Sequence, residues 1–231
     1  MDTNFETVVL DETTSTQDEV AKRLGSAPLL VVARSQTRGR GRSGADWANA
    51  PRAVAASLGF RPIWPTSRWP LITLVSGVAA VRALRYHPDG LTLKWPNDLM
   101  RGDEKLGGIL TEAGGGRVIT GWGANLYWPD PPCGWGAIFD EDPGVEAAVE
   151  LGRSWAGELL EMVSRPVDLW PHEEYRRLCS TLGRLITWVP DGRGRAVTVS
   201  PQGGLEVATA RGPVTLTAGE VTELRHGRRD H

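Results

Sequence analysis

The sequence predicts an α/β fold of the α+β type, in which helices cover a mixed sheet and a small C-terminal β domain follows. The main observation is that apolar runs of strand length alternate with longer helical runs through most of the chain. The second is a change after Gly183 to short alternating runs punctuated by glycines. We therefore expect a larger domain over residues 1–182 and a smaller one over residues 183–231, which suits a chain of 231 residues.

The first expected element is a helix that ends at about Leu24, just before a glycine. Two pairs of capping-box type precede its apolar residues, from Thr14 to Gln17 and from Thr16 to Glu19. Such pairs satisfy the unpaired N–H groups of a first helical turn, so they predict that the helix begins here.

The other elements follow from the period of their apolar residues. Strands are expected at residues 29–33, 54–60, 91–95, 108–112 and 118–124. Helices are expected at residues 69–84, 142–163 and 170–182. Short C-terminal strands are expected at residues 185–189, 196–199, 205–208 and 214–216. Residues 126–142 contain several prolines and glycines and follow neither period, which indicates a long surface loop.

Composition excludes several classes of protein. The 26 basic and 28 acidic side chains give a net charge of -2, which provides no overall attraction to nucleic acid or to an anionic membrane. The N-terminus lacks the basic start and apolar run of a signal peptide, and no apolar stretch reaches the ~20 residues of a bilayer span. Cys133 and Cys179 have no CxxC partner, so we expect two buried thiols in a cytoplasmic protein.

An arginine- and glycine-rich segment, residues 38–44, is the first candidate for chemistry. Glycines let the backbone approach a ligand, and guanidinium groups match phosphate or carboxylate oxygens. A flexible solvated loop is the alternative interpretation. The segment also fits Gly-x-Gly-x-x-Gly, but residues 34–38 separate it from the preceding strand and Pro51 prevents a long helix after it. A dinucleotide-binding fold is therefore not indicated.

The segment Lys94-Trp95-Pro96-Asn97-Asp98 ends a predicted strand, because a residue before proline favours extended backbone. Asn97 and Asp98 are therefore expected at the mouth of that strand. Lys105 then brings a second cation to the start of the next strand. A plain turn with a surface lysine is the alternative.

The segment Gly121-Trp122-Gly123-Ala124-Asn125 closes another predicted strand. An asparagine can donate and accept at once, which suits a nucleotide, although a left-handed turn would explain it equally well. Trp47, beside the arginine- and glycine-rich segment, could stack on a base.

In this order and spacing, the motifs resemble the biotin protein ligase family. The motifs that carry the resemblance are Ser15-Thr16-Gln17, Gln36 to Trp47, Lys94 to Asp98, Lys105 to Ile109 and Gly121 to Asn125. Leu182-Gly183-Arg184 and the later glycine-punctuated strands are similar to the family's SH3-like C-terminal β-barrel domain. The resemblance covers nearly the whole chain.

The resemblance implies a biotin/lipoate ligase-like catalytic domain that forms biotinyl-AMP and pyrophosphate from biotin and ATP, after which a lysine of a biotin carboxyl carrier protein attacks the adenylate. It implies that Arg42 and Lys105 are catalytic. The residues implied for biotin are Ser15, Thr16, Gln17, Gln36, Arg40, Gly41, Arg42 and Lys105. The residues implied for ATP are Arg40, Arg42, Trp47, Asn97 and Asn125. Mg²⁺ is expected with the phosphates, and Asp98 is the nearest candidate carboxylate.

Two positions depart from the family's pattern. Ala45-Asp46 stands where many members carry further basic residues, which bears on ATP affinity, and Gln17 stands where asparagine is common. Only about a dozen residues precede the Ser-Thr motif, so we expect a ligase without the DNA-binding domain of the members that repress transcription, present as a monomer or homodimer.

Two alternatives stay open. One is an acyl ligase of the same fold that acts on lipoate or another acid, and the other is a biotin sensor without catalysis. The arginine- and glycine-rich segment and Lys94-Trp95-Pro96-Asn97 favour biotin, while the presence of Arg42 and Lys105 favours catalysis.

Overall fold

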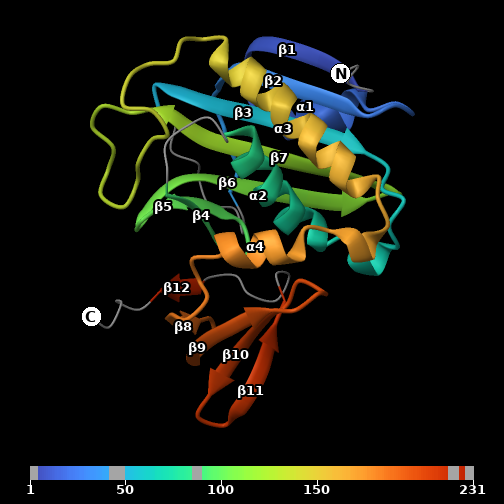
Figure 1. Ribbon diagram of the computed structural model, residues 1–231. Coiled ribbons are helices and arrows are strands. Elements are labelled where there is room, and N and C mark those ends of the chain that lie inside the picture. The colour runs from blue at the N-terminus through green and yellow to red at the C-terminus, as the bar shows by residue number, and fades with distance from the viewer. Residues whose placement is uncertain (1–4, 42–49, 85–89, 218–223, 227–231) are drawn as a thin grey trace.

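The computed structural model of the chain describes residues 5–41, 50–84, 90–217 and 224–226 (Figure 1). It contains a large sheet with helices on both faces and a smaller sheet below it in the view of Figure 1. This is the predicted combination of a mixed α/β sheet with a small C-terminal β domain. The division at residues 182 and 183 stays a prediction.

The larger sheet has seven strands in the order β1-β2-β3-β7-β6-β5-β4. Its strands are β1 (Glu6–Thr13), β2 (Leu29–Gln36), β3 (Arg52–Phe60), β4 (Leu91–Lys94), β5 (Asp98–Arg101), β6 (Glu104–Gly114) and β7 (Arg117–Tyr127). β1 and β2 are parallel, and every other neighbouring pair is antiparallel. The sheet is therefore mixed, as predicted.

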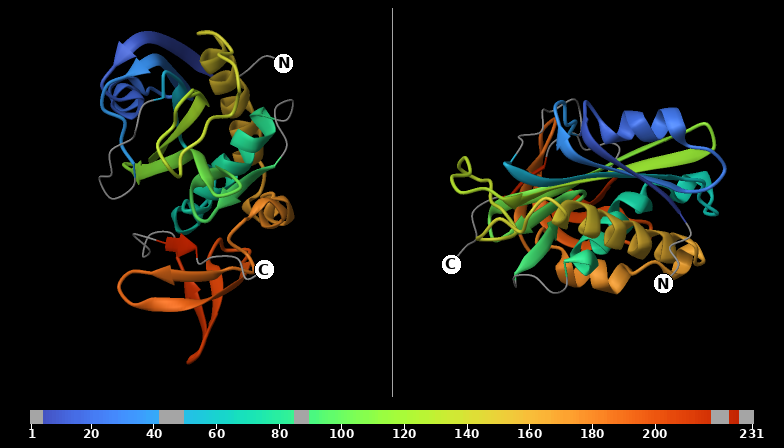
Figure 2. Two further views of the ribbon diagram at one scale, coloured as in Figure 1. Left: turned by 90° about the vertical axis from the view of Figure 1, so that its left-hand side faces the viewer. Right: turned by 90° about the horizontal axis from the view of Figure 1, so that it is seen from above.

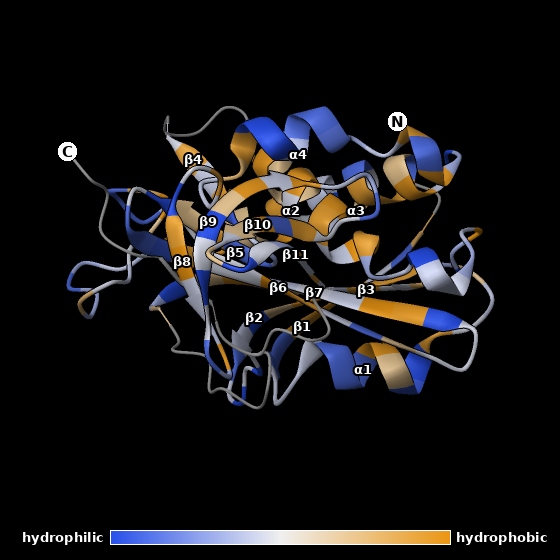
Figure 3. Ribbon diagram, turned by 90° about the horizontal axis from the view of Figure 1, so that it is seen from below, coloured by the Kyte–Doolittle hydropathy of each residue, from blue (hydrophilic) through white to orange (hydrophobic). Residues whose placement is uncertain are grey.

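The helices divide unequally between the two faces of this sheet. They are α1 (Thr16–Arg23), α2 (Leu71–Ala83), α3 (Ala147–Val163) and α4 (His172–Leu178), with 3-10 turns at Thr66–Arg68 and Val167–Leu169. α1 lies by itself on one face, and the other three helices lie on the opposite side (Figures 2 and 3). No helix in the described residues is both long enough and apolar enough to span a membrane.

Alternation along β2 explains this two-sided cover. Leu29 and Val31 pack against Val20 of α1, whereas Leu30 and Val32 belong to the main core with α2 and α3. Successive side chains of a strand point to opposite faces, so one strand serves two apolar layers. The face under α1 is the one that carries the cavity described below.

The smaller sheet has five antiparallel strands in the order β11-β10-β9-β8-β12. Its strands are β8 (Leu185–Trp188), β9 (Gly192–Val199), β10 (Leu205–Thr209), β11 (Gly212–Leu216) and β12 (Leu224–His226). Its buried residues join the same apolar cluster as the larger sheet, with Ile186, Val207 and Leu216 among them. The molecule therefore has one continuous main core.

Three strands were not predicted: β1, β5 and β12. β1 is an edge strand with only intermediate or exposed residues, so its alternation is weak, although Thr7-Val8-Val9 is a β-branched run that could have indicated it. β5 begins at Asp98, where only a turn was expected. β2 also runs to Gln36, so the arginine- and glycine-rich segment follows its strand more closely than predicted.

The cap of α1 differs from both predicted capping boxes. The N-cap residue is Ser15, whose Oγ accepts a hydrogen bond from the N–H of Asp18 at 3.4 Å. Thr16 is then the first helical residue, which directs its hydroxyl into the site rather than to the cap. The predicted end was correct, since Leu24 is the C-cap.

Tertiary contacts also shorten two helices. α3 was expected from residue 142 but begins at Ala147, because Asp142 binds Arg52 and the N–H of Gly144 instead of capping a helix. α4 was expected to reach residue 182 but ends at Leu178, since Cys179 and Ser180 pair with Leu93 of β4. Cys179 is buried as expected, whereas Cys133 is exposed, which corrects that prediction.

Candidate active site

A cavity of about 490 Å³ opens on the side of the larger sheet that α1 covers. Its lining comes from α1, β2, β3, the turn between β4 and β5, β6, β7 and the loop before α3. Most sequence-predicted site residues line it: Ser15, Thr16, Gln17, Gln36, Arg40, Gly41, Asn97, Asp98 and Lys105. Segments spread over 90 positions of sequence therefore converge on one site.

The floor of the cavity is made largely of small residues on three adjacent strands. Ser57 of β3 pairs with Gly121 of β7, and Gly123 of β7 pairs with Gly108 of β6, whereas Leu110 opposite Gly121 is larger. A Cβ atom at residue 121 would lie 2.6 Å from Gln17 Oε1, closer than such atoms approach. The space above the sheet therefore exists because these strands carry small side chains there.

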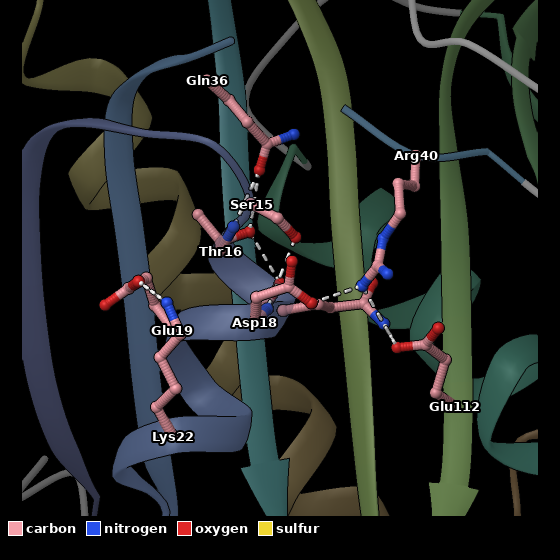
Figure 4. Close-up of polar contacts among 10 residues, drawn as sticks. Ser15, Thr16, Asp18, Glu19, Lys22, Gln36, Arg40 and Glu112 are labelled. Carbon is pink, nitrogen blue, oxygen red and sulfur yellow. Dashed lines mark hydrogen bonds and ion pairs between the residues drawn. The ribbon is translucent and has the colours of Figure 1, made fainter. Parts of the chain in front are cut away.

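At one end of the cavity, α1 presents hydroxyl and amide groups (Figure 4). The N–H and the hydroxyl of Thr16 both donate to Gln36 Oε1, at 2.9 and 3.2 Å, and the same hydroxyl lies 2.8 Å from Ser57 Oγ. Ser15, Thr16 and Gln17 are each less than 10% exposed. These groups are neutral and fixed in place, so this end suits a neutral polar group of a ligand.

Two carboxylates that the sequence did not single out hold this end together. Gln17 Nε2 donates to Glu112 Oε2 at 2.7 Å, and Arg40 binds Asp18 at 2.8 Å and Glu112 at 3.6 Å (Figure 4). Ser57 was also not predicted. Glu112 could have been found, because strand alternation from Gly108 places it on the same face of β6.

At the other end, the turn between β4 and β5 faces the start of β6. Lys105 Nζ lies 2.6 Å from Asp98 Oδ1 and 5.7 Å from the centre of the Trp135 ring. Asn97 Nδ2 donates to the carbonyl oxygen of Ile109 at 3.1 Å, and the N–H of Ile109 donates back to Asn97. This end carries a cation at the start of β6 beside a braced turn, which suits an anionic group.

Trp135 brings the loop between β7 and α3 onto this end. The N–H of Lys105 donates to the carbonyl of Gly134, and the N–H of Gly136 donates to the carbonyl of Lys105. The aromatic ring then lies over the Lys105 ammonium, a cation–π arrangement. The long loop was predicted, but its contact with the site was not.

Asn125 occupies a different position from the other predicted residues. It lies inside β7 rather than at its end, is fully buried and does not line the cavity. Its Nδ2 donates to the carbonyl of Gly136 at 2.9 Å, and its Oδ1 finds no partner among the described residues. Its assignment to ATP stays a prediction. Arg42 and Trp47 lie outside the described residues.

The chemistry available here is binding and charge stabilisation. Among the described lining residues there is no histidine and no cysteine, so the serines and threonines have no imidazole base beside them. Nor do three His, Cys, Asp or Glu side chains cluster as a metal site in the described part of the chain. The arrangement fits a reaction in which one substrate attacks another and the protein positions both.

Comparison with known proteins gives a consistent result. The model of the biotin/lipoate A/B protein ligase family matches residues 8–123, half of the chain. The biotin–[acetyl-CoA-carboxylase] ligase of Mycobacterium tuberculosis is 29% identical over 94% of this chain and 88% of its own length. The bifunctional ligase/repressor BirA of Bacillus subtilis is 39% identical over 45% of this chain, which is 33% of that protein.

A solved structure shows the same fold. The biotin protein ligase from Aquifex aeolicus, in complex with biotin and ATP, superimposes with a TM-score of 0.81 and covers 96% of this chain and 99% of its own, at 24% identity. The match includes both sheets, because nearly all of each chain is covered. By its sequence and its architecture, the chain belongs to the biotin/lipoate A/B protein ligase family, within which it groups with the biotin protein ligases.

Proposed function

We propose that this chain is an ATP-dependent biotin–protein ligase that forms biotinyl-AMP and transfers biotin to a lysine of a biotin carboxyl carrier protein. The observation that carries the proposal is the two-ended cavity. Neutral hydroxyl and amide groups from α1, β2 and β3 stand at one end, and Lys105 stands at the other. Biotin has the matching form, with a neutral ureido ring at one end and a carboxylate at the other.

The first step needs no nucleophile from the protein. A carboxylate oxygen of biotin forms a bond to the α-phosphorus of ATP, and the bond from that phosphorus to the bridging oxygen breaks, so pyrophosphate leaves. Lys105 and Arg42 are assigned to the charge that develops on the acyl phosphate, since preorganised cations stabilise such charge strongly. In the second step a carrier lysine attacks the acyl carbon, and AMP leaves.

The biotin ring is assigned to Ser15, Thr16, Gln17 and Gln36, which line the cavity together, and Thr16 and Gln36 are already joined by hydrogen bonds. Arg40 and Gly41 also line the cavity, and with Arg42 and Lys105 they are assigned to biotin as well. For ATP we retain Arg40, Arg42, Trp47, Asn97 and Asn125. Asn125 does not line the cavity, but among the described residues its Oδ1 has no hydrogen-bond partner, which supports its assignment.

Mg²⁺ is proposed to enter with the phosphates of ATP, because this ion usually binds one or two carboxylates together with substrate phosphates. Asp98 fits such a role in that its carboxylate lines the cavity. Asp98 Oδ1 already pairs with Lys105 Nζ, so the Asp98 carboxylate would have to share its two oxygens between the ion and the lysine. We further propose that the protein works in the cytoplasm, as a monomer or homodimer.

The test is release of pyrophosphate by the purified protein with biotin and ATP, and labelling of a biotin carboxyl carrier domain detected with streptavidin. Wild-type protein should give both. Lys105→Ala should lower the rate of release roughly 100-fold or more, as loss of one such donor does elsewhere. Lys22→Ala is the matched control, because Lys22 is an exposed lysine that pairs with Glu19 on α1.

Other outcomes would replace the proposal. Release with lipoate and not with biotin would make the chain a ligase for a different acid. Tight binding of biotin without release would make it a sensor.

A further inference from the structure

Glu112 contacts the biotin end of the cavity without lining it. Its Oε2 accepts a hydrogen bond from Gln17 Nε2 at 2.7 Å, and about half of the Glu112 side chain is exposed. Gln17 itself is 6% exposed and does line the cavity. Glu112 can therefore influence a ligand only through the residues it holds.

The chemistry of this contact fixes the orientation of the Gln17 amide. An amide has a donor end and an acceptor end of nearly equal shape, and it can turn over unless its neighbours distinguish the two. An ionised carboxylate only accepts, so Glu112 selects the NH₂ group of Gln17. The carbonyl oxygen is thereby directed to the other side, where it lies over Gly121 on the cavity floor.

We propose that Glu112 is a positioning residue that presents the Gln17 carbonyl oxygen to the cavity as a hydrogen-bond acceptor, and so sets a preference for a ligand head that carries N–H groups. The inference rests on the proposed function, in which that head is the ureido ring of biotin. With Glu112 removed, the amide can present either end, and the site loses its ability to distinguish an N–H from a methylated nitrogen.

The contact with Arg40 must be separated from the effect of Glu112 on the Gln17 amide. Glu112 also lies 3.6 Å from Arg40, so its removal loosens the segment after β2 as well as the Gln17 amide. Asp18 binds the same arginine at 2.8 Å, and in the described part of the chain its side chain makes no hydrogen bond with that of Gln17. Asp18→Ala therefore measures the loss of the Arg40 contact alone.

The experiment is a titration calorimetry series with the full chain. The Kd values of biotin, of biotin methylated on either ureido nitrogen, and of ATP are measured for wild type, Glu112→Ala, Glu112→Gln and Asp18→Ala. Gln17→Met is added alone and combined with Glu112→Ala, because this cycle isolates the coupling between the two residues. Thermal unfolding of each variant checks the fold, and Glu112→Gln keeps the size of the side chain.

Glu112→Ala should weaken biotin roughly tenfold, the loss of about one hydrogen bond, and should leave the Kd of ATP within about twofold. It should have little further effect on the methylated biotins or in the Gln17→Met background. Glu112→Gln should weaken biotin less than Glu112→Ala, and Asp18→Ala should not change the ratio between biotin and its methylated forms.

Three results would overturn the inference. They are an undiminished Glu112→Ala effect in the Gln17→Met background, an equal loss for methylated and unmethylated biotin, and no effect on biotin at all. If wild-type protein itself fails to bind biotin, the proposed function falls as well. That result is distinct from wild-type binding that Glu112→Ala leaves intact, in which case the ligase proposal stands and only this inference fails.

Discussion

At residue 121 the strand β7 carries no side chain, and the amide of Gln17 occupies the space above it. A Cβ atom there would meet Gln17 Oε1 at 2.6 Å and Ser57 Oγ at 3.1 Å. The end of the glutamine side chain can move at small cost to the fold, but it then leaves its place in the site. Gly121→Ala should therefore weaken biotin roughly tenfold or more while changing the melting temperature by only a few degrees.

Calorimetry and thermal unfolding together check this prediction. Gly114→Ala is the control, because it adds the same methyl group to β6 at a point where no atom lies within 4 Å. Equal biotin affinities for the two variants would contradict the role of residue 121 as the floor of the cavity.

At the level of single residues, the sequence predicted the site residues whose side chains have an evident chemical role. Thr16, Gln36 and Lys105 belong to motifs with a recognisable order, and the structure brings them to one cavity. Ser57 belongs to no motif, and its place on the floor of the cavity comes from the register of β3 with β7. Register depends on the pairing of distant segments, which a single sequence does not display.

At the level of elements, the loop between β7 and α3 is held near its middle and near its end. Near its middle, Trp135 and Gly136 pair with Lys105, and Gly136 also accepts from Asn125. Near its end, both oxygens of Asp142 bind the guanidinium of Arg52, at 2.8 and 2.9 Å. A long loop of this composition therefore keeps a defined course beside the site.

The Asp142 contact makes part of this order dependent on pH. The Arg52 guanidinium, helped by the N–H of Gly144, lowers the pKa of Asp142 from 3.8 to about 2. A carboxyl whose pKa is lower in the folded state stabilises that state above its unfolded pKa. The contribution is thus complete above about pH 4 and is lost as the pH falls from 3.8 to about 2.

Asp142→Asn should therefore lower the melting temperature at neutral pH, and the difference from wild type should shrink as the pH falls through this window. Thermal unfolding of both proteins between pH 2 and 7 measures it. A difference that stays constant down to pH 2 would mean that the carboxylate charge has no part in holding the loop.

Prediction of elements was reliable where an apolar period decides the structure, and it was wrong where a tertiary contact decides. The strands β3 and β7 of the larger sheet and the helix that ends at Val163 have strong periods. The start of α3 depends on the hydrogen bonds between Asp142 and Arg52. The end of α4 depends on the pairing of Cys179 with Leu93. Those partners lie about 90 residues away, beyond the reach of local patterns.

At the level of the whole molecule, the segment just before the smaller sheet and a loop within that sheet both support the site turn of the larger sheet. Trp95, which precedes the Pro96-Asn97 turn, donates its backbone N–H to Thr181 Oγ1 at 3.0 Å. Its indole N–H donates to the carbonyl of Gly203, between β9 and β10, at 3.1 Å. Both contacts are buried, so the turn that carries Asn97 and Asp98 depends on residues from the C-terminal part.

Thr181→Val should test this support. The change keeps the shape of the side chain but leaves the buried N–H of Trp95 without its acceptor, which costs about 1–3 kcal/mol. Chemical denaturation should show that loss as a single transition for the whole chain, because one core cluster includes both sheets. Thr181→Ser, which retains the hydroxyl, should lose less. Two separate transitions in wild-type protein would contradict the shared core.

The different exposure of the two cysteines allows a spectroscopic label to be attached at a single position. Burial raises the pKa of the Cys179 thiol, which keeps it protonated and shielded, whereas Cys133 is exposed. A maleimide dye will therefore attach at one place in the unmodified sequence. That place is two residues from the indole that covers Lys105, so a single label on the native chain sits next to the cavity.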